Sequence, residues 1–131
     1  MQISKEADYA LRAVLYLARL ADHQQASTGT IAASEHIPVS FLAKIVARLS
    51  SARIIRTSRG ARGGVSLDRP SEQITVLDVI EAIDGPIAIK ECVLHSGRCP
   101  YGENCTLQPI LCEAQAALVT RLQQTTFDQL I

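Results

Sequence analysis

A short, basic and glycine-rich stretch, RIIRTSRGARGGVSLDRP at residues 53–70, constrains the fold of this chain more than any other feature. Its segments RIIRTS and GVSL predict two short strands, and RGARGG between them predicts a tight turn. Glycines at positions 60, 63 and 64 permit the positive φ angles and close backbone approach that such a turn requires. The stretch therefore predicts a basic β-hairpin.

Three helical patterns precede this hairpin, in residues 4–22, 28–37 and 39–52. Ser4 and Ser40 are the expected N-caps of the first and third helices, and Pro38 ends the second. The expected buried stripe of the third helix consists of Phe41, Leu42, Ile45, Val46 and Leu49. Two short helices joined by a tight turn and followed by a hairpin predict a winged helix-turn-helix.

Charge is distributed unevenly along the chain, although the formal net charge is zero. Residues 1–69 carry ten Lys or Arg side chains and five acidic ones, a difference of +5. Residues 70–131 carry three basic and eight acidic side chains, a difference of −5. A basic half joined to an acidic half favours a polyanionic partner for the first half.

The base-reading candidates lie at the start of the third helix, because a recognition helix enters the major groove by its N-terminal end. These candidates are Val39, Ser40, Ala43 and Lys44, while Phe41 and Leu42 are expected to hold the helix on the core. In the hairpin the candidates are Arg59, Arg62 and Gly63, since arginine favours phosphate and narrow minor grooves. The alternative is a hairpin whose arginines only face solvent.

The second half of the chain predicts two further helices. TVLDVIEAID, residues 75–84, predicts one that Gly85 and Pro86 end, and Gln108–Gln124 predicts a long amphipathic one, after which TTFDQLI adds a turn. The long helix presents Ile110, Leu111, Ala114, Ala117, Leu118, Arg121 and Leu122 along one side. Its own chain offers little surface to cover that side, so a symmetric dimer is expected, and packing on the chain's first helix is the alternative.

These patterns together predict a mainly α fold with a small β-hairpin wing and a long C-terminal dimerisation helix. The predicted regions are a winged helix-turn-helix at 1–70, a connecting helix at 71–91, a cysteine loop at 92–105, and a dimerisation helix with its tail at 106–131.

Three of the four cysteines, Cys92, Cys99 and Cys105, occupy one loop with the spacing C-x6-C-x5-C. The N-terminus lacks a signal-peptide pattern and no apolar run approaches the roughly 18 residues of a membrane span, so we expect a cytoplasmic protein with reduced thiols and no membrane partner. Structural zinc usually uses closer cysteine pairs. Three thiolates on a loop rich in glycine and proline are able to hold an iron–sulfur cluster, and a cluster-free thiol-redox switch is the alternative.

The segments ISKEADYALRAVLYLA, IPVSFLAKIVARL, RTSRGARGGVSL and ITVLDVIEAIDGP, followed by the three-cysteine loop, resemble the Rrf-two family of bacterial regulators along essentially the whole chain. That family includes IscR, NsrR and RirA. The resemblance implies a winged-helix dimer whose C-terminal helices cross, with an iron–sulfur cluster near the dimer interface. By position it implies cluster ligation by Cys92, Cys99 and Cys105, and DNA contact by Ser40 and Arg59.

The resemblance leaves the fourth cluster ligand open. In the IscR branch a histidine lies three residues after the last loop cysteine, where this chain has Gln108, a poor ligand. In the NsrR branch an aspartate of the first helix reaches across from the partner subunit, and Asp8 stands at the matching place. Asp8 is therefore the expected ligand and favours a 4Fe–4S over a 2Fe–2S cluster, with Cys112 as the runner-up. Glu6, His95 and a small molecule are further alternatives.

The predicted function is that of a homodimeric regulator, with repression the expected action, that binds a pseudo-palindromic double-stranded operator. Its expected signal is nitric oxide, iron–sulfur status or redox stress. A small electron-transfer protein is a less favoured alternative, because it leaves the basic hairpin and helix-turn-helix without a role. No phosphate loop, nucleophile motif or histidine–carboxylate pair indicates an enzyme.

Overall fold

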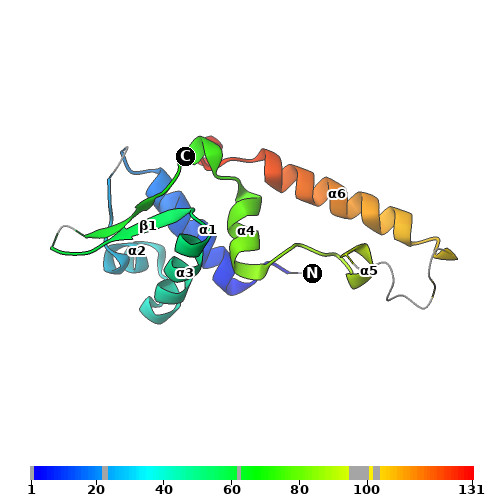
Figure 1. The fold of residues 1–131 in the computed structure, drawn as a ribbon, viewed down its shortest axis with the longest axis horizontal. Coiled ribbons are helices and arrows are strands. Elements are labelled where there is room, and N and C mark those ends of the chain that lie inside the picture. The colour runs from blue at the N-terminus through cyan, green and yellow to red at the C-terminus, as the bar shows by residue number, and fades with distance from the viewer. Residues whose placement is uncertain (1, 22–23, 62, 95–100, 102–103) are drawn as a thin grey trace.

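The chain folds as a run of short helices around one hairpin, and it ends in a long helix. The computed structural model describes residues 2–131 except 22–23, 62, 95–100 and 102–103. The elements are α1 (Lys5–Ala18), α2 (Thr28–Glu35), α3 (Val39–Ser51), β1 (Ile55–Ser58), β2 (Gly64–Leu67), η1 (Ser71–Gln73), α4 (Val76–Asp84), α5 (Glu91–Leu94), α6 (Gln108–Gln124) and η4 (Phe127–Leu130), as Figure 1 shows. This order confirms the predicted fold class. No helix among the described residues has the length and hydropathy that crossing a bilayer requires.

Helix α1 lies at the centre of the first half, because its sequence places small side chains on the buried face. Ser4 caps it as predicted, since the Ser4 hydroxyl accepts a hydrogen bond from the Ala7 amide at 3.0 Å. Ala7, Ala10 and Val14 have no exposed surface. Small buried side chains allow neighbouring helices to approach closely, and α1 contacts α2, α3 and α4.

The turn between α2 and α3 differs from the prediction in its capping. His36 ends α2 in the left-handed conformation, with φ 54°. Pro38, and not Ser40, is the N-cap of α3, and its carbonyl accepts hydrogen bonds from the amides of Phe41 and Leu42 at 3.0 Å. The predicted Ser40 cap is therefore wrong. Proline already has the φ of a helix start, so α3 begins directly after it and Ser40 lies inside the first turn.

We expect His36→Gly to raise the free energy of unfolding by about 0.5–1 kcal/mol. In the left-handed conformation a residue with a Cβ is strained by about 1–2 kcal/mol, and glycine relieves that strain. The larger conformational entropy of glycine in the unfolded state offsets part of the stability gained. Urea unfolding followed by circular dichroism would measure the change. His36→Ala is the matched control because it keeps a Cβ, and equal unfolding free energies for the two variants would contradict the expectation.

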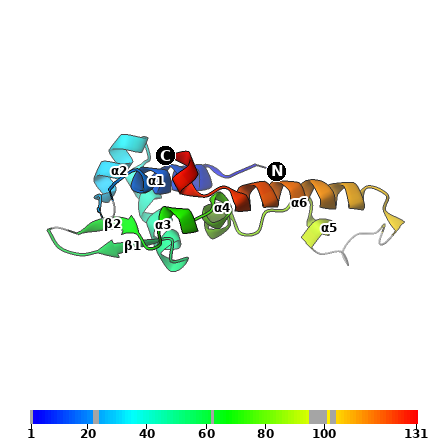
Figure 2. The ribbon, with the colours of Figure 1, turned by 90° about the horizontal axis from the view of Figure 1, so that it is seen from above.

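The hairpin is antiparallel and its base is fixed to the core. Its register pairs Ile55 with Leu67 at the base. Ala26, which precedes α2, adds a β-bridge to Val65, with N–O distances of 3.0 and 2.8 Å. Ile55 and Val65 are buried. The base of the hairpin is thus anchored to the core, and Figure 2 shows β1 and β2 projecting from the helices.

Helix α4 is closed at both of its ends by local sequence signals. At the start, Thr75 and Asp78 exchange two side-chain to backbone hydrogen bonds of 3.0 Å in a capping box. At the end, Gly85 adopts φ 77°, in agreement with the predicted stop.

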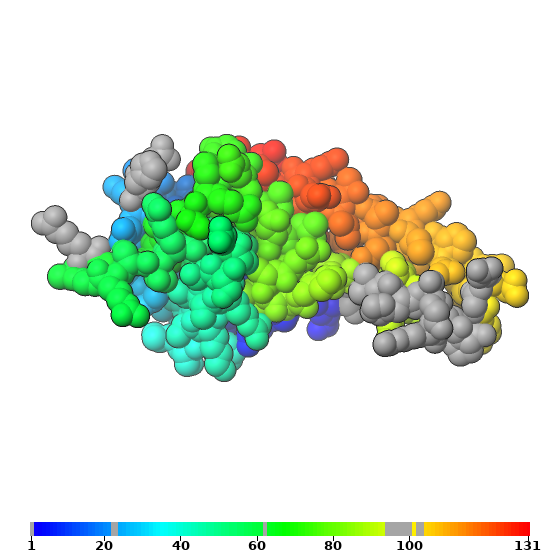
Figure 3. All heavy atoms as spheres, in the orientation of Figure 1, coloured from blue at the N-terminus to red at the C-terminus, as the bar shows by residue number. Residues whose placement is uncertain are grey.

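Helix α6 has the predicted bounds and contacts α4 and α5. It extends away from the first half instead of lying along α1 (Figures 1 and 3). The alternative of packing on the chain's own first helix therefore does not describe this structure.

The C-terminal segment returns to the core of the first half. After α6, the amide of Val76 donates to the carbonyl of Thr125 at 2.9 Å, and the amide of Phe127 donates to the carbonyl of Ile74 at 3.1 Å. The side chain of Phe127, on η4, is only 1% exposed and belongs to the main hydrophobic core. The sequence predicted an added turn here, but not its burial.

Candidate nucleic-acid interface and cysteine segment

Helix α3 separates a buried face from an exposed face. Leu42, Ile45 and Leu49 are buried in the main core. The four base-reading candidates, Val39, Ser40, Ala43 and Lys44, are all exposed. Val39 is 64% exposed, so its side chain is accessible to a partner. The exposed face carries no acidic side chain, because α3 contains none.

Phe41 departs from its predicted role, because it is not inside the core. Its side chain is 38% exposed and lies edge-on to the Tyr9 ring, with 6.0 Å between ring centroids and 65° between planes. The Lys5 ammonium lies 5.8 Å from the centroid of the Tyr9 ring. Lys5 and Tyr9 thus adjoin the start of α3, although neither was a candidate from the sequence. Their spacing of four on α1 was the available signal.

The tip of the hairpin depends on glycine. Arg59 is exposed there. Gly60 adopts φ 105°, and its carbonyl accepts a hydrogen bond from the Gly63 amide at 2.8 Å. A Cβ at Gly63 would meet three backbone atoms, which are the Ser58 carbonyl oxygen, the Arg59 carbonyl carbon at 2.8 Å and the Gly60 carbonyl oxygen at 2.9 Å. Arg62, the remaining candidate, lies outside the described residues.

The cysteine segment is described in part. Cys92, on α5, and Cys105, shortly before α6, are half-buried free thiols. Cys112 is also a half-buried free thiol, on α6. Cys99 and His95 lie outside the described residues. Within the described part of the chain, no three His, Cys, Asp or Glu side chains come together as a metal site.

The backbone that leads from α4 to the cysteine segment is held by Gln115, which was not a candidate from the sequence. Gln115, on α6, is 9% exposed. Its side-chain oxygen accepts from the amide of Ile89 at 2.9 Å, and its side-chain nitrogen donates to the carbonyl of Ile87. The apolar pattern of α6 gave no signal for a buried glutamine, because its partners are backbone groups of another segment.

Among the described residues of this single chain, Asp8 forms no metal-binding group with Cys92, Cys105 or Cys112. It lies on α1, and its carboxylate accepts from the Arg12 guanidinium at 3.0 Å, in a pair four residues apart on the helix. The two side chains are about half exposed, at 49% and 55%. Such a pair stabilises a helix only weakly, so it leaves Asp8 exchangeable for another partner.

The chain matches the family described as "Rrf2: Iron-dependent Transcriptional regulator" over residues 3–131. Rv1287 of Mycobacterium tuberculosis, which bears the name of an HTH-type transcriptional regulator, is 36% identical over 128 residues, covering 96% of this chain and 78% of that protein. The HTH-type transcriptional regulator NsrR of Shouchella clausii is 30% identical over 132 residues, covering 100% and 89%.

Two solved structures show the same fold. CymR, the global cysteine regulator of Bacillus subtilis, superposes with a TM-score of 0.86 at 25% identity, covering 99% of this chain and 95% of that one. The oxidized form of Staphylococcus aureus CymR gives a TM-score of 0.78 at 26% identity, with the same coverage. The relatives are regulators and not enzymes. With its recognition helix and wing in place, the chain belongs to the Rrf2 family of winged-helix, DNA-binding transcriptional regulators.

Proposed function

We propose that this chain is a homodimeric regulator whose operator affinity depends on an iron–sulfur cluster bound by Cys92, Cys99 and Cys105. The observation that carries the proposal is that Cys92, on α5, and Cys105, shortly before α6, are half-buried free thiols close to one another in the chain. The iron-dependent description of the family and the likeness to NsrR support it.

The donor set suits such a cluster, because soft thiolates are the usual ligands of iron–sulfur centres. Asp8 of a second copy is the proposed fourth ligand, since its weak pair with Arg12 leaves the carboxylate available. Cys112 remains the runner-up, and a 4Fe–4S cluster is favoured over a 2Fe–2S cluster. When bound, the cluster would supply a centre that nitric oxide, oxygen or iron shortage destroys.

A second copy of the chain is proposed to cover α6. Ile110 is 63% exposed, and Leu111, Leu118 and Leu122 are only half-buried, although all four are on the predicted apolar side. Pairing this helix with its copy would bury these side chains and present two recognition helices, which suits a pseudo-palindromic operator.

DNA contact is proposed at the exposed start of α3 and at the wing. Val39, Ser40, Ala43 and Lys44 would face base edges, because they share the exposed face of the recognition helix. Arg59 would reach phosphate or the minor groove from the hairpin tip, with Arg62 and Gly63 beside it in sequence.

We expect protein purified without oxygen to contain iron and acid-labile sulfide in near-equal amounts. Cys92→Ala should remove both, because a thiolate ligand is lost. Asp8→Ala should keep the cluster but shorten its lifetime in air, while Cys112→Ala, the matched control, should behave as wild type. Elemental analysis and visible absorbance would measure these properties. Zinc alone, or no metal with four free thiols, would overturn the cluster proposal.

A cluster-free thiol switch is the second candidate, favoured by the likeness to the oxidized form of CymR. It predicts reversible loss of operator affinity on mild oxidation of metal-free protein, with thiols lost from Cys92, Cys99 or Cys105. Thiol titration beside iron analysis separates the two candidates.

A further inference from the structure

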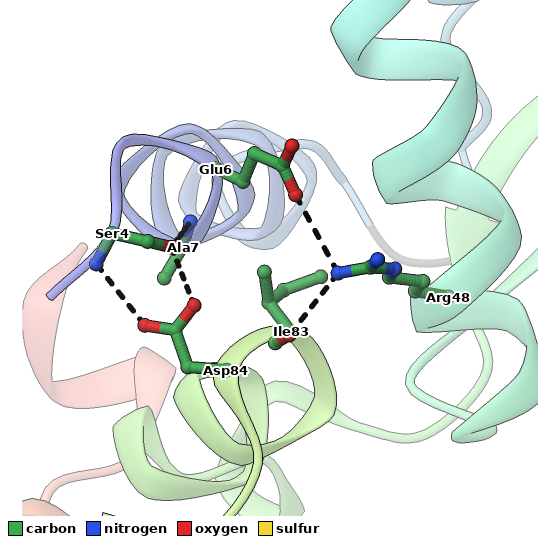
Figure 4. A network of polar contacts seen from close by, with 6 residues as sticks. All are labelled: Ser4, Glu6, Ala7, Arg48, Ile83 and Asp84. Atoms are coloured by element: carbon green, nitrogen blue, oxygen red, sulfur yellow. Dashed lines mark hydrogen bonds and ion pairs between the residues drawn. The ribbon is translucent and has the colours of Figure 1, made fainter.

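The start of α1, the end of the recognition helix α3 and the end of α4 meet at one polar junction, shown in Figure 4. Arg48, in the last turns of α3, donates through Nη1 to the backbone carbonyl of Ile83 at 3.1 Å. The same nitrogen lies 3.5 Å from the Glu6 carboxylate on α1. One guanidinium therefore joins the recognition helix to the start of α1 and to the end of α4.

A second set of contacts closes the junction. The Ser4 amide donates to the Asp84 carboxylate at 3.1 Å, and the Ser4 hydroxyl donates to the other carboxylate oxygen. Asp84 ends α4, where a negative charge is unfavourable, but it lies at the N-terminus of α1, where the helix dipole favours one. Arg48 in turn brings a positive charge to the C-terminal carbonyls of α4. Each of these two charged side chains therefore stabilises the end of a neighbouring helix: Asp84 the start of α1, and Arg48 the end of α4.

The end of α4 also leads directly to the cysteine segment. Gly85 turns the chain, and the following residues, Ile87 and Ile89, are held on α6 by Gln115. Cys92 follows three residues after Ile89. The carbonyl that Arg48 binds is therefore connected to the proposed sensor by a short, anchored piece of backbone.

We propose that Arg48 is a positioning residue for DNA binding, which sets the axial position of α3 against α1 and α4 and so relays the state of the cysteine segment. The relay rests on the proposed sensor function, while the positioning role requires only DNA binding. The buried stripe of α3 decides which face is inside, but apolar contacts are not directional. The hydrogen bond and ion pair of Arg48 are directional and fix the end of the helix.

The test uses Glu6→Gln, because its two possible effects on DNA affinity have opposite signs. Removing an acid from the basic half would strengthen all DNA binding if only net charge mattered. If Glu6 positions α3 through Arg48, affinity should instead fall by about three- to thirtyfold for a specific duplex. The specific probe is a duplex selected from a random-sequence pool by the wild-type protein, and a mixed-sequence duplex of equal length is the non-specific probe.

Glu81→Gln is the matched control, since Glu81 is an exposed acid on α4 and the charge change is the same. Arg48→Met should also weaken specific binding. The double variant should lose no more affinity than Arg48→Met alone, because the contact that Glu6→Gln weakens is one that Arg48→Met already removes. The melting temperature of Glu6→Gln should stay close to wild type, since the Arg48 and Glu6 side chains are 52% and 34% exposed.

Specific binding by Glu6→Gln that equals binding by Glu81→Gln would overturn the positioning role, even if Arg48→Met does not fold. Failure of wild-type protein to select any duplex would instead overturn the DNA contacts proposed for the interface. If Glu6→Gln lowers affinity for the specific duplex equally in cluster-loaded and cluster-free protein, the positioning role stands and the relay is overturned.

Discussion

Phe127→Ala is expected to lower the free energy of unfolding by about 3–5 kcal/mol, which is the usual cost of emptying an aromatic site in a closed core. Phe127 is 1% exposed and packs in the same core as α1 and α3. The side chain also anchors η4, the segment after α6, in the core. Its loss should therefore weaken the packing that holds the end of α6 against the first half of the chain. Urea unfolding followed by circular dichroism would measure the change.

The control for this prediction is Leu130→Ala, in the same short helix. Leu130 is 41% exposed, so we expect its replacement to cost less than about 1 kcal/mol. If Phe127→Ala lowers the free energy of unfolding by a similarly small amount, the C-terminal turn does not stabilise the core. The contacts of η4 with α1 would then contribute little to stability.

The sequence predicted the bounds of α6 but not the burial of Phe127, which follows it. The bounds of α6, Gln108–Gln124, follow from local helical periodicity and agree with the structure. The burial of Phe127 depends on backbone pairing with Ile74, which is 53 positions earlier in the chain, and no local pattern contains that pairing. Local signals thus predicted where elements lie, and failed where a distant segment decides burial.

The same distinction applies to the candidate interface. The exposed face of α3 was predicted, because one helical stripe determines both its buried and its exposed side. The prediction for Phe41 was wrong, since its ring lies against Tyr9 of α1 and is 38% exposed, and the pattern of α3 alone does not contain that contact. The junction of Arg48 with Glu6, 42 positions away, was also not predictable from spacing. The charge asymmetry indicated a polyanion partner without indicating which arginine contacts DNA and which one joins helices.

The largest expected effect on function is that of Gly63→Ala, which should weaken binding to the selected duplex by about ten- to a hundredfold, the cost of losing one or two arginine contacts. An added Cβ at Gly63 would meet backbone atoms of Ser58, Arg59 and Gly60, which cannot rotate away as a side chain can. The tip of the hairpin must therefore change shape, and Arg59 with it. The base should persist, because Ala26 and Val65 hold it to the core.

Gly29→Ala provides the matched control, because the nearest atom to a Cβ there, the Ser27 hydroxyl, is at an ordinary 4.0 Å. That variant should bind DNA like wild type and be slightly more stable, since alanine favours helix. Arg59→Ala distinguishes an effect through the Arg59 side chain from an effect through the backbone of the hairpin tip. If Gly63→Ala acts by displacing Arg59, the double variant should bind DNA no more weakly than the weaker of the two single variants. Full additivity would mean that the tip backbone contacts DNA by itself, and wild-type affinity for Gly63→Ala would remove the wing from the interface.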